Sequence, residues 1–449
     1  MGKEPGKGTI PLDLGVKALK QLEVSLKGEI VDPVVRPQFN LAVEVSSFSP
    51  RKLMAALGQT FPVETADAKA LDHIALKADV KGDTQNVSVS KGALDLDQSK
   101  ISFSVKAQDF SKPDVAFDVN LDEIDVDRYL PPASEEGPDK EKKKAESPRR
   151  EQQKIDYAPL RRLVLDGTVK VGKLKAHGAS IQDVYVKVLG KSGRFNLDPL
   201  TLKLYGGDVS SRVALDVRQD IPKSNMELHA KGIQVGPLLK DVMETDFLEG
   251  TAQSKMAVSL VGDDPAKIKR TLNGTGDLLF NDGAIVGIDL AGMVRNVKAT
   301  FGLAEEGENR PRTDFSELRA PFTITDGVVN TPGTSLMSPL LRVLAAGNAN
   351  LVEETLDFRV EPKFVATLKG QGDAADRSGL MVPVLVTGTF PSPKFRPDLK
   401  GMLKKGLEGE LLKSPDLKKI LPGQSTQEGE SKPLEEQAKD LLKGLPFGR

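Results

Sequence analysis

The stretch DVAFDVNL, from Asp114 to Leu121, alternates polar and apolar side chains without a break. Val115, Phe117 and Val119 belong to its apolar set. A period of two places such residues on one face of a β-strand and leaves the other face to water. The stretch therefore predicts a strand with one apolar and one hydrated face, which is typical of antiparallel sheets.

The same alternation recurs along the chain, in FNLAVEV (39–45), ISFSVKA (101–107), SRVALDV (211–217) and KMAVSLVG (255–262). Turn-forming segments such as KGDTQN (81–86) and DIPKSN (220–225) separate these strands. A chain of 449 residues is too long for one ordinary core. We predict a mainly β protein with elongated, strongly curved antiparallel sheets built from repeated β units, and with a few amphipathic helices.

Three segments that begin at Pro37, Pro113 and Pro222 form an internal repeat. Each has a proline, an alternating strand, and then a pattern that indicates the start of a helix or a turn. One such unit is too small to bury its apolar face by itself, so the units are expected to form an array.

The composition divides the chain into four regions. Residues 1–133 form an N-terminal β-repeat region, and residues 134–155 a charged, flexible linker without a large apolar side chain. Residues 156–397 form a C-terminal β domain, with one inserted amphipathic helix near 288–301. Residues 398–449 are expected to be a helical or disordered tail.

Charge and cysteine content exclude several classes of function. The formal net charge is -1, so no basic balance favours nucleic acid. Cysteine is absent, which excludes disulfides, thiolate metal sites and thiol nucleophiles. No run of about 18 apolar residues predicts a membrane-spanning helix, and the first residues lack the apolar core of a signal peptide.

A search for catalytic patterns gives no candidate. The histidines stand apart from one another, at His73, His177 and His229. Asp277, Asp282 and Asp289 do not have the spacing of a calcium loop. Neither a Walker A motif nor a serine-hydrolase elbow occurs. We therefore expect a protein that is not an enzyme and that has no cofactor and no metal.

The stretch GTGDLLFNDGAIVGIDL (274–290) resembles a phosphate-binding loop at first sight, but Leu279 stands where a dinucleotide fingerprint requires its third glycine. Asn281, Asp282 and Gly283 are instead expected to form the tight structural turn of a β-hairpin, because Asp-Gly supplies the positive φ of a type I′ turn. The stretch then predicts a strand, a turn, a second strand and a helix.

Several blocks, in order, resemble the C-terminal region of the AsmA family. They include FNLDPLTLKLYGGDVSSRVALDV (195–217), LNGTGDLLFNDGAIVGIDLAGMV (272–294) and VPVLVTGTFPSPKFRPDL (382–399). The resemblance covers roughly residues 160–399 well and residues 15–132 more weakly. It indicates that residues 156–397 are the AsmA-like domain.

The resemblance implies a protein of the Gram-negative envelope, located in the periplasm and held at the inner membrane by an N-terminal helix. It implies a role in outer-membrane biogenesis and in regulating protein targeting to that membrane. It also implies kinship with TamB-like, bridge-like lipid transport proteins. This chain is expected to lack the anchor helix and some β structure before it, and so to carry no signal or transmembrane segment of its own.

The alternating strands admit two arrangements, a closed sandwich core or an open apolar groove that holds phospholipid. With a closed core, the protein would be an interaction scaffold for outer-membrane protein assembly, with envelope proteins as partners. With an open groove, the lipid-facing candidates are the apolar members of the repeated strands: Phe39, Leu41, Val43, Phe103, Val105, Phe117, Val119, Leu202, Leu204, Leu215, Met256 and Val258.

Overall fold

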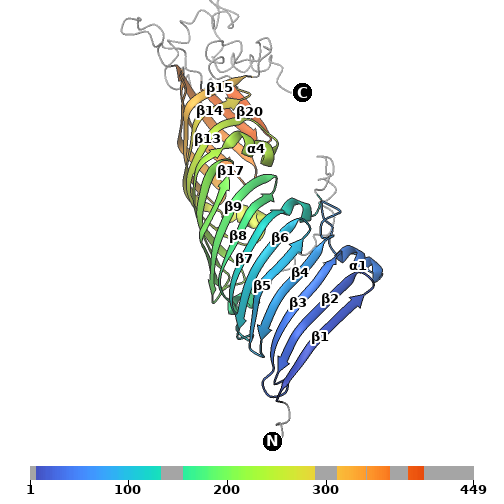
Figure 1. Cartoon of the computed structure of the whole chain (residues 1–449). Coiled ribbons are helices and arrows are strands. Elements are labelled where there is room, and N and C mark those ends of the chain that lie inside the picture. Colours follow the sequence, from blue (N-terminus) through green and yellow to red (C-terminus); the bar gives the residue numbers. More distant parts are fainter. Residues whose placement is uncertain (1–6, 133–154, 289–310, 340, 365–382, 399–449) are drawn as a thin grey trace, which may run out of the picture. The chain divides into compact units, whose positions relative to one another are not determined.

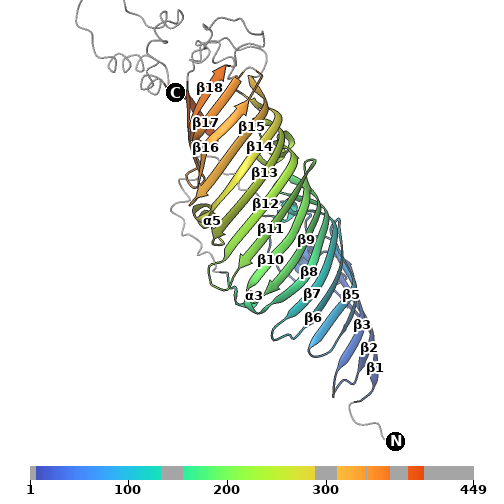
Figure 2. The ribbon, with the colours of Figure 1, turned by 90° about the vertical axis from the view of Figure 1, so that its left-hand side faces the viewer.

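The computed structural model describes residues 7–132, 155–288, 311–339, 341–364 and 383–398. These residues form a mainly β structure, in which the strands make one long, strongly twisted and curved sheet (Figures 1 and 2). The predicted inserted helix near 288–301, the linker 134–155 and the tail 398–449 lie wholly or almost wholly outside the described residues.

The sheet has 20 strands within the described residues. The first seven are β1 (Thr9–Ala18), β2 (Leu22–Val31), β3 (Gln38–Phe48), β4 (Ile74–Gly82), β5 (Asn86–Leu96), β6 (Ser99–Gln108) and β7 (Asp114–Asp125). The next seven are β8 (Val164–Ala176), β9 (Ala179–Lys191), β10 (Arg194–Leu204), β11 (Gly207–Asp216), β12 (Lys223–Gln234), β13 (Leu248–Val261) and β14 (Asn273–Val286). The last six are β15 (Arg312–Thr325), β16 (Val328–Met337), β17 (Leu341–Asn350), β18 (Thr355–Phe364), β19 (Val384–Thr389) and β20 (Ser392–Pro397).

Each strand pairs with its neighbours in sequence, from β1 to β20. Every pairing is antiparallel except that of β7 with β8, which is parallel. A parallel pairing needs a crossover, and the chain between Asp125 and Val164 makes this connection. Within the described residues β1 pairs only with β2 and β20 only with β19, so the sheet has two free edges.

Short helices lie at the two ends of the strands. One rim carries the elements that follow β3, β7 and β12, namely α1 (Pro50–Ala56), the 3-10 helix η1 (Val126–Tyr129) and α4 (Val235–Met243). The opposite rim carries α3 (Ala158–Arg162), before β8, and α5 (Pro265–Thr271), before β14. Figures 1 and 2 show the two sets on different borders of the sheet.

The internal repeat is confirmed. The alternating strands after Pro37, Pro113 and Pro222 are β3, β7 and β12, and each runs into a short helix. Side chains fix two of these starts, since Ser49 Oγ accepts a hydrogen bond from Lys52 N and the Asp125 carboxylate accepts one from Asp127 N.

The predicted hairpin turn at Asn281, Asp282 and Gly283 is wrong. The strand β14 runs through these residues, and both Asn281 and Gly283 pair with β15, opposite Glu317 and Phe315. Only Asp282 has a positive φ, of 50°. The register with β13 contains a β-bulge here, because Thr251 pairs with Asn281 and Glu249 with Ala284, so that Asp282 and Gly283 together face one residue of β13. A left-handed Asp is compatible with a bulge as well as with a turn, so the dipeptide alone misleads.

Candidate functional site: the apolar face of the sheet

The strand register joins the alternating strands into one continuous apolar face. A single row of paired residues can be followed across all the described strands, and every member is apolar or glycine. We call it the central row; it consists of Leu12, Gly28, Leu41, Val80, Val89, Val105, Phe117, Gly167, Val188, Leu197, Val213, Met226, Val258, Gly274, Ile324, Val329, Ala349, Leu356, Gly388 and Pro393.

All twelve candidates from the sequence lie on this face. Four of them belong to the central row, and the other eight lie on the same side in neighbouring rows: Phe39, Val43, Phe103, Val119, Leu202, Leu204, Leu215 and Met256. Val119, for example, pairs with Phe103 on one side and with Val169 on the other. The face thus unites residues from both ends of the repeat array.

The exposure of these side chains shows whether a second layer of the described residues covers the face. A second packed layer would bury them almost completely. Val258 is 8% exposed, but the other eleven candidates are only half-buried. In the described part of the chain, the sheet therefore presents this face without a second layer over it.

Buried apolar residues pack together in two small clusters of the described structure. Tyr157, Phe195 and Val217 form one of them beneath α3, together with the candidate Leu215. Phe315, Leu336, Leu341 and Val343 form the other, across β15 to β17. Leu215 therefore belongs to a packed cluster at the rim rather than to the open part of the face.

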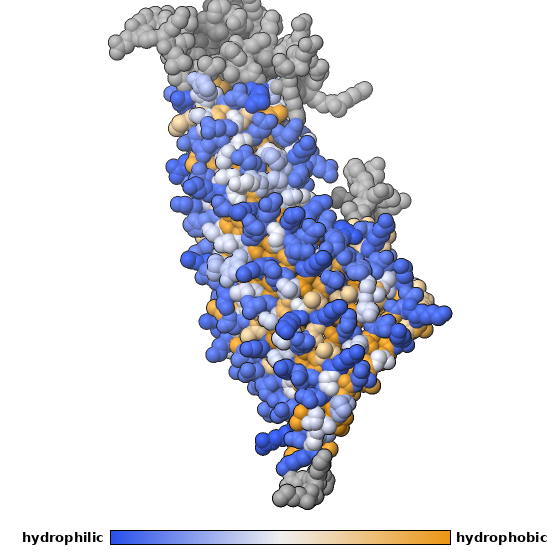
Figure 3. All heavy atoms as spheres, viewed as in Figure 1, coloured by the Kyte–Doolittle hydropathy of each residue, from blue (hydrophilic) through white to orange (hydrophobic). Residues whose placement is uncertain are grey.

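Figure 3 shows the apolar face over the N-terminal half of the sheet. Apolar side chains gather in a band over the strands from about β3 to β9, between borders of hydrophilic side chains. The band follows the direction in which strands succeed one another, as the register requires. An apolar molecule could therefore stay in contact with the face while it moves from strand to strand.

Glycines of this face are a feature that sequence reasoning missed. A phenylalanine stands opposite a glycine in seven cross-strand pairs of the described strands. The pairs are Phe39–Gly82, Phe103–Gly92, Phe117–Gly167, Phe195–Gly190, Phe322–Gly276, Phe315–Gly283 and Phe358–Gly347. A glycine within a strand pattern signals a close approach, but only the register identifies the ring that approaches it.

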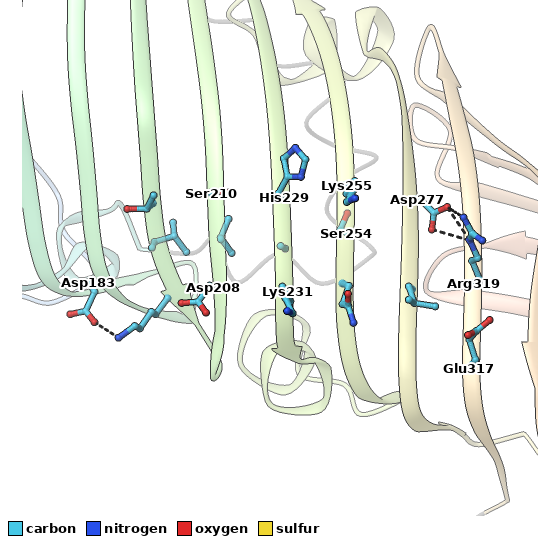
Figure 4. A pocket seen from close by; sticks show the side chains of 17 residues that line it. Asp183, Asp208, Ser210, His229, Lys231, Ser254, Lys255, Asp277, Glu317 and Arg319 are labelled. Atoms are coloured by element: carbon cyan, nitrogen blue, oxygen red, sulfur yellow. Dashed lines mark hydrogen bonds and ion pairs between the residues drawn. The ribbon is translucent and has the colours of Figure 1, made fainter.

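The opposite face is hydrophilic. Ser210, His229, Lys255 and Asp277 form one of its rows, one residue out of step with the apolar rows. Part of this face, on β9 to β15, has a shallow hollow of ≈ 860 Å³, and most of its lining side chains are polar or charged (Figure 4).

Ion pairs cross this hollow between strands. Lys203 Nζ lies 2.9 Å from an Asp183 carboxylate oxygen, and an Arg319 guanidinium nitrogen lies 2.8 Å from an Asp277 carboxylate oxygen (Figure 4). Both pairs are largely exposed, so each contributes little to stability. Their main effect is to keep this face hydrated and thus distinct from the apolar face.

Aspartate carboxylates form hydrogen bonds between loops on the rim that carries α1, η1 and α4. The Asp97 carboxylate accepts hydrogen bonds from the backbone N–H groups of Leu71, Asp72 and His73, and from the Tyr129 hydroxyl at 2.8 Å. Burial by itself would raise the pKa of Asp97, but these hydrogen bonds outweigh it and lower that pKa. Burial and the bond to Asp97 raise the pKa of Tyr129 to about 12.

On the same rim, aspartate carboxylates at η1 and α4 also accept hydrogen bonds from neighbouring loops. The Asp127 carboxylate accepts hydrogen bonds from the backbone N–H groups of His177 and Gly178, which lower its pKa. The Tyr205 hydroxyl donates to the Asp241 carboxylate of α4 at 2.6 Å. These contacts connect neighbouring loops. His73 and His177 contribute backbone N–H groups to them.

The described residues hold no group of three or more His, Asp or Glu side chains that could bind a metal ion. Nor does any helix among them have the length and apolar character needed to cross a bilayer.

The fold and its face define a class of protein: a single, long β-sheet with one continuous apolar face, over which the described residues place no second layer. Residues 18–334 match the AsmA family, and the chain belongs to that family. It is 24% identical over 265 residues to Protein AsmA of Escherichia coli (strain K12), a match that covers 57% of this chain and 42% of that protein.

A second relative is the AsmA family protein YhjG of the same organism, which is 24% identical over 241 residues. That match covers 51% of this chain and 33% of the relative. The chain therefore spans less than half the length of the curated relatives it matches. No solved structure matches it.

Proposed function

We propose that this protein holds phospholipid by its acyl chains on the apolar face of the sheet, and passes it along that face, as a non-enzymatic component of Gram-negative envelope biogenesis. The observation that carries the proposal is the central row, which crosses the described strands without a polar side chain. Membership of the AsmA family supports the envelope setting.

The energetics favour such a face. A buried methylene contributes about 0.8 kcal/mol, so some thirty methylenes of a phospholipid cost on the order of 25 kcal/mol to expose to water. A continuous apolar surface removes much of that barrier at every step along the sheet. The polar head group remains in water, so no buried cation is needed to receive it.

Passage along the face needs no covalent chemistry. Acyl chains are held by non-directional apolar contact, so neighbouring positions on a row of Val, Leu, Phe and Gly are similar in energy. Similar energies allow movement from strand to strand. We therefore propose a binding and transfer role rather than an enzymatic one, with phospholipid as the partner and with a periplasmic location next to the inner membrane.

The substitution Val119→Asp tests the proposal, because Val119 lies on the apolar face in the middle of β7. A carboxylate there should abolish most phospholipid binding, since an ionised group cannot be covered by acyl chains without a large desolvation cost. The measurement is the amount of phospholipid that co-purifies with the protein from membranes, determined by mass spectrometry, with far-UV circular dichroism as the check on folding.

The matched control is Asn120→Asp. Asn120 is the next residue of β7, it is exposed, and it points to the hydrophilic face. The same charge at this position should leave lipid binding unchanged. Equal loss in both variants, or wild-type protein without phospholipid, would contradict the proposal. If Val119→Asp unfolds the protein, the uncharged Val119→Gln variant takes its place.

The alternative is a scaffold for outer-membrane protein assembly, and the free edge of β1 favours it. Ile10, Leu14 and Val16 of this strand are 49%, 48% and 54% exposed, and in the described residues β1 pairs on one side only. An apolar edge strand can accept a strand from another protein. Protein that is free of phospholipid but captures such a strand would favour the scaffold.

A further inference from the structure

We infer that the phenylalanine–glycine pairs limit how far the phenylalanine rings project from the sheet, so that acyl chains can pass along the apolar face. Each glycine leaves space in which the opposite ring lies against the sheet. This inference rests on the proposed function and names the residues that would determine clearance along the face. Five of the seven pairs lie on the open part of the face, those of Phe39, Phe103, Phe117, Phe322 and Phe358, all half-buried.

The geometry is shown by the space that a β-carbon would need at each glycine. At Gly92 it would lie 2.6 Å from two atoms of the Phe103 ring and 2.7 Å from a third. At Gly276 it would lie 2.4 Å from the Phe322 ring. These separations are far below van der Waals contact, so the ring occupies the volume that any other residue would fill.

A ring that lies on a glycine does not stand up from the sheet. Side chains of a strand otherwise project roughly perpendicular to it, and phenylalanine is the largest apolar residue on this face. An alanine opposite would force the ring to turn away from the sheet, into the space where acyl chains are proposed to bind. The glycines thus allow large apolar side chains on the face without obstructing it.

The same pairing is expected to stabilise the sheet, because an aromatic ring shields a glycine backbone from water. A role in stability and a role in clearance predict different outcomes when both residues of a pair are substituted. If the pair serves stability alone, removing both partners should be worse than removing one. If it serves clearance, removing the displaced ring should restore the open path.

The test uses Gly92→Ala, Phe103→Ala and the double variant Gly92→Ala/Phe103→Ala in the full chain. At Gly92 the nearest atoms to an added β-carbon belong to the Phe103 side chain, so the backbone need not shift. The probe is fluorescently labelled phosphatidylethanolamine, offered in vesicles of phosphatidylethanolamine and phosphatidylglycerol, and read as labelled lipid bound per folded protein and as its rate of transfer to acceptor vesicles.

We expect Gly92→Ala to lose most of the transfer, and the double variant to regain it despite a lower melting temperature. The matched control is Gly190→Ala, where a β-carbon would lie 2.5 Å from the Phe195 ring. Phe195 is 7% exposed and packs in the cluster beneath α3, away from the open path. This control should lower the melting temperature while transfer continues.

The outcomes separate this inference from the proposed function. If wild-type protein neither binds nor transfers the labelled lipid, the proposed function fails and the inference fails with it. If wild-type protein transfers lipid but Gly92→Ala transfers equally well, only the inference is overturned. A double variant that transfers no better than Gly92→Ala also overturns it, since the displaced ring would then not be the obstacle.

Discussion

Asp97 connects three loops of one rim through a single carboxylate. It accepts hydrogen bonds from three successive backbone N–H groups, starting at Leu71, and from the Tyr129 hydroxyl. Hydrogen bonds to a charged acceptor contribute more than those to a neutral one. We predict that Asp97→Asn lowers the free energy of unfolding by roughly 1–2 kcal/mol at neutral pH. Urea denaturation would measure it.

The pH dependence of this effect has a definite sign. Because the folded-state pKa of Asp97 is lowered, the carboxylate stabilises the protein fully above its unfolded-state pKa of about 3.9. That contribution is lost as the pH falls through the folded-state pKa, so wild type and variant should converge below about pH 4. A difference in the free energy of unfolding between wild type and variant that stays constant down to pH 3 would contradict this prediction.

The control is Asp95→Asn, since the Asp95 carboxylate forms no hydrogen bond among the described residues.

The residues that the sequence could identify are those whose position follows from alternation alone. Val119 and its eleven companions share a face because strand periodicity is strict. Gly92 and Gly283 could not be identified, because their role depends on a residue of another strand. At Gly283 a β-carbon would lie 2.1 Å from the Glu249 carbonyl oxygen, so the glycine is required by close approach and not by a turn.

Among the elements, α4 is held to the sheet by a contact that its own sequence does not reveal. It follows β12, yet a β-carbon at Gly178, just before β9, would lie 2.2 Å from the Asp241 carbonyl oxygen of α4. The Tyr205 hydroxyl donates to the Asp241 carboxylate and accepts from Ser180 N. Tyr205 therefore connects the helix to the strand ends it crosses.

We predict that Tyr205→Phe loosens α4, since one hydrogen bond of this kind contributes about 1 kcal/mol. Hydrogen–deuterium exchange of residues 235–243 should accelerate severalfold, while exchange in the central strands stays unchanged. Tyr185→Phe is the control, because the Tyr185 hydroxyl has no hydrogen-bond partner in the described ranges. Unchanged exchange in α4 would show that apolar packing alone holds the helix.

Element prediction succeeded where a pattern was long and local. The strands around Phe39, Phe117 and Met226 follow from alternation, and the short helices after them follow from the repeat. The hairpin prediction at Asp282 failed because a bulge and a tight turn use the same left-handed residue, and only the pairing of β14 with β13 and β15 distinguishes them. Periodicity likewise does not reveal whether a second layer covers a face.

At the scale of the whole sheet, the parallel pairing of β7 with β8 joins two antiparallel series of described strands. The strands pair from Asp114 with Val164 to Asp125 with Lys175. We predict that a chain cleaved at a protease site placed within residues 134–155 stays together as one particle on size-exclusion chromatography. The pieces should separate only under denaturing conditions, because the ladder and the apolar contacts across it persist without the covalent connection.

Separation of the two pieces in native buffer would contradict this prediction. The control is the same cleavage site in a chain that carries Phe117→Asp. Phe117 lies opposite Gly167 in the pairing of β7 with β8, so a charge there should weaken the association of the two pieces. In the uncut chain the covalent connection would hide this effect. The comparison distinguishes the pairing of β7 with β8 from an unrelated contact between the two series.

The neighbour-to-neighbour order of the strands also has a consequence for synthesis of the protein. Each strand finds its partner in the segment made just before it, so a hairpin can form as soon as its second strand leaves the ribosome. The connection between β7 and β8 is the longest between consecutive described strands, so this pairing waits longest for its second strand to be synthesised. Translation speed between those two strands should therefore affect the yield of correctly folded protein more than it does elsewhere in the sheet.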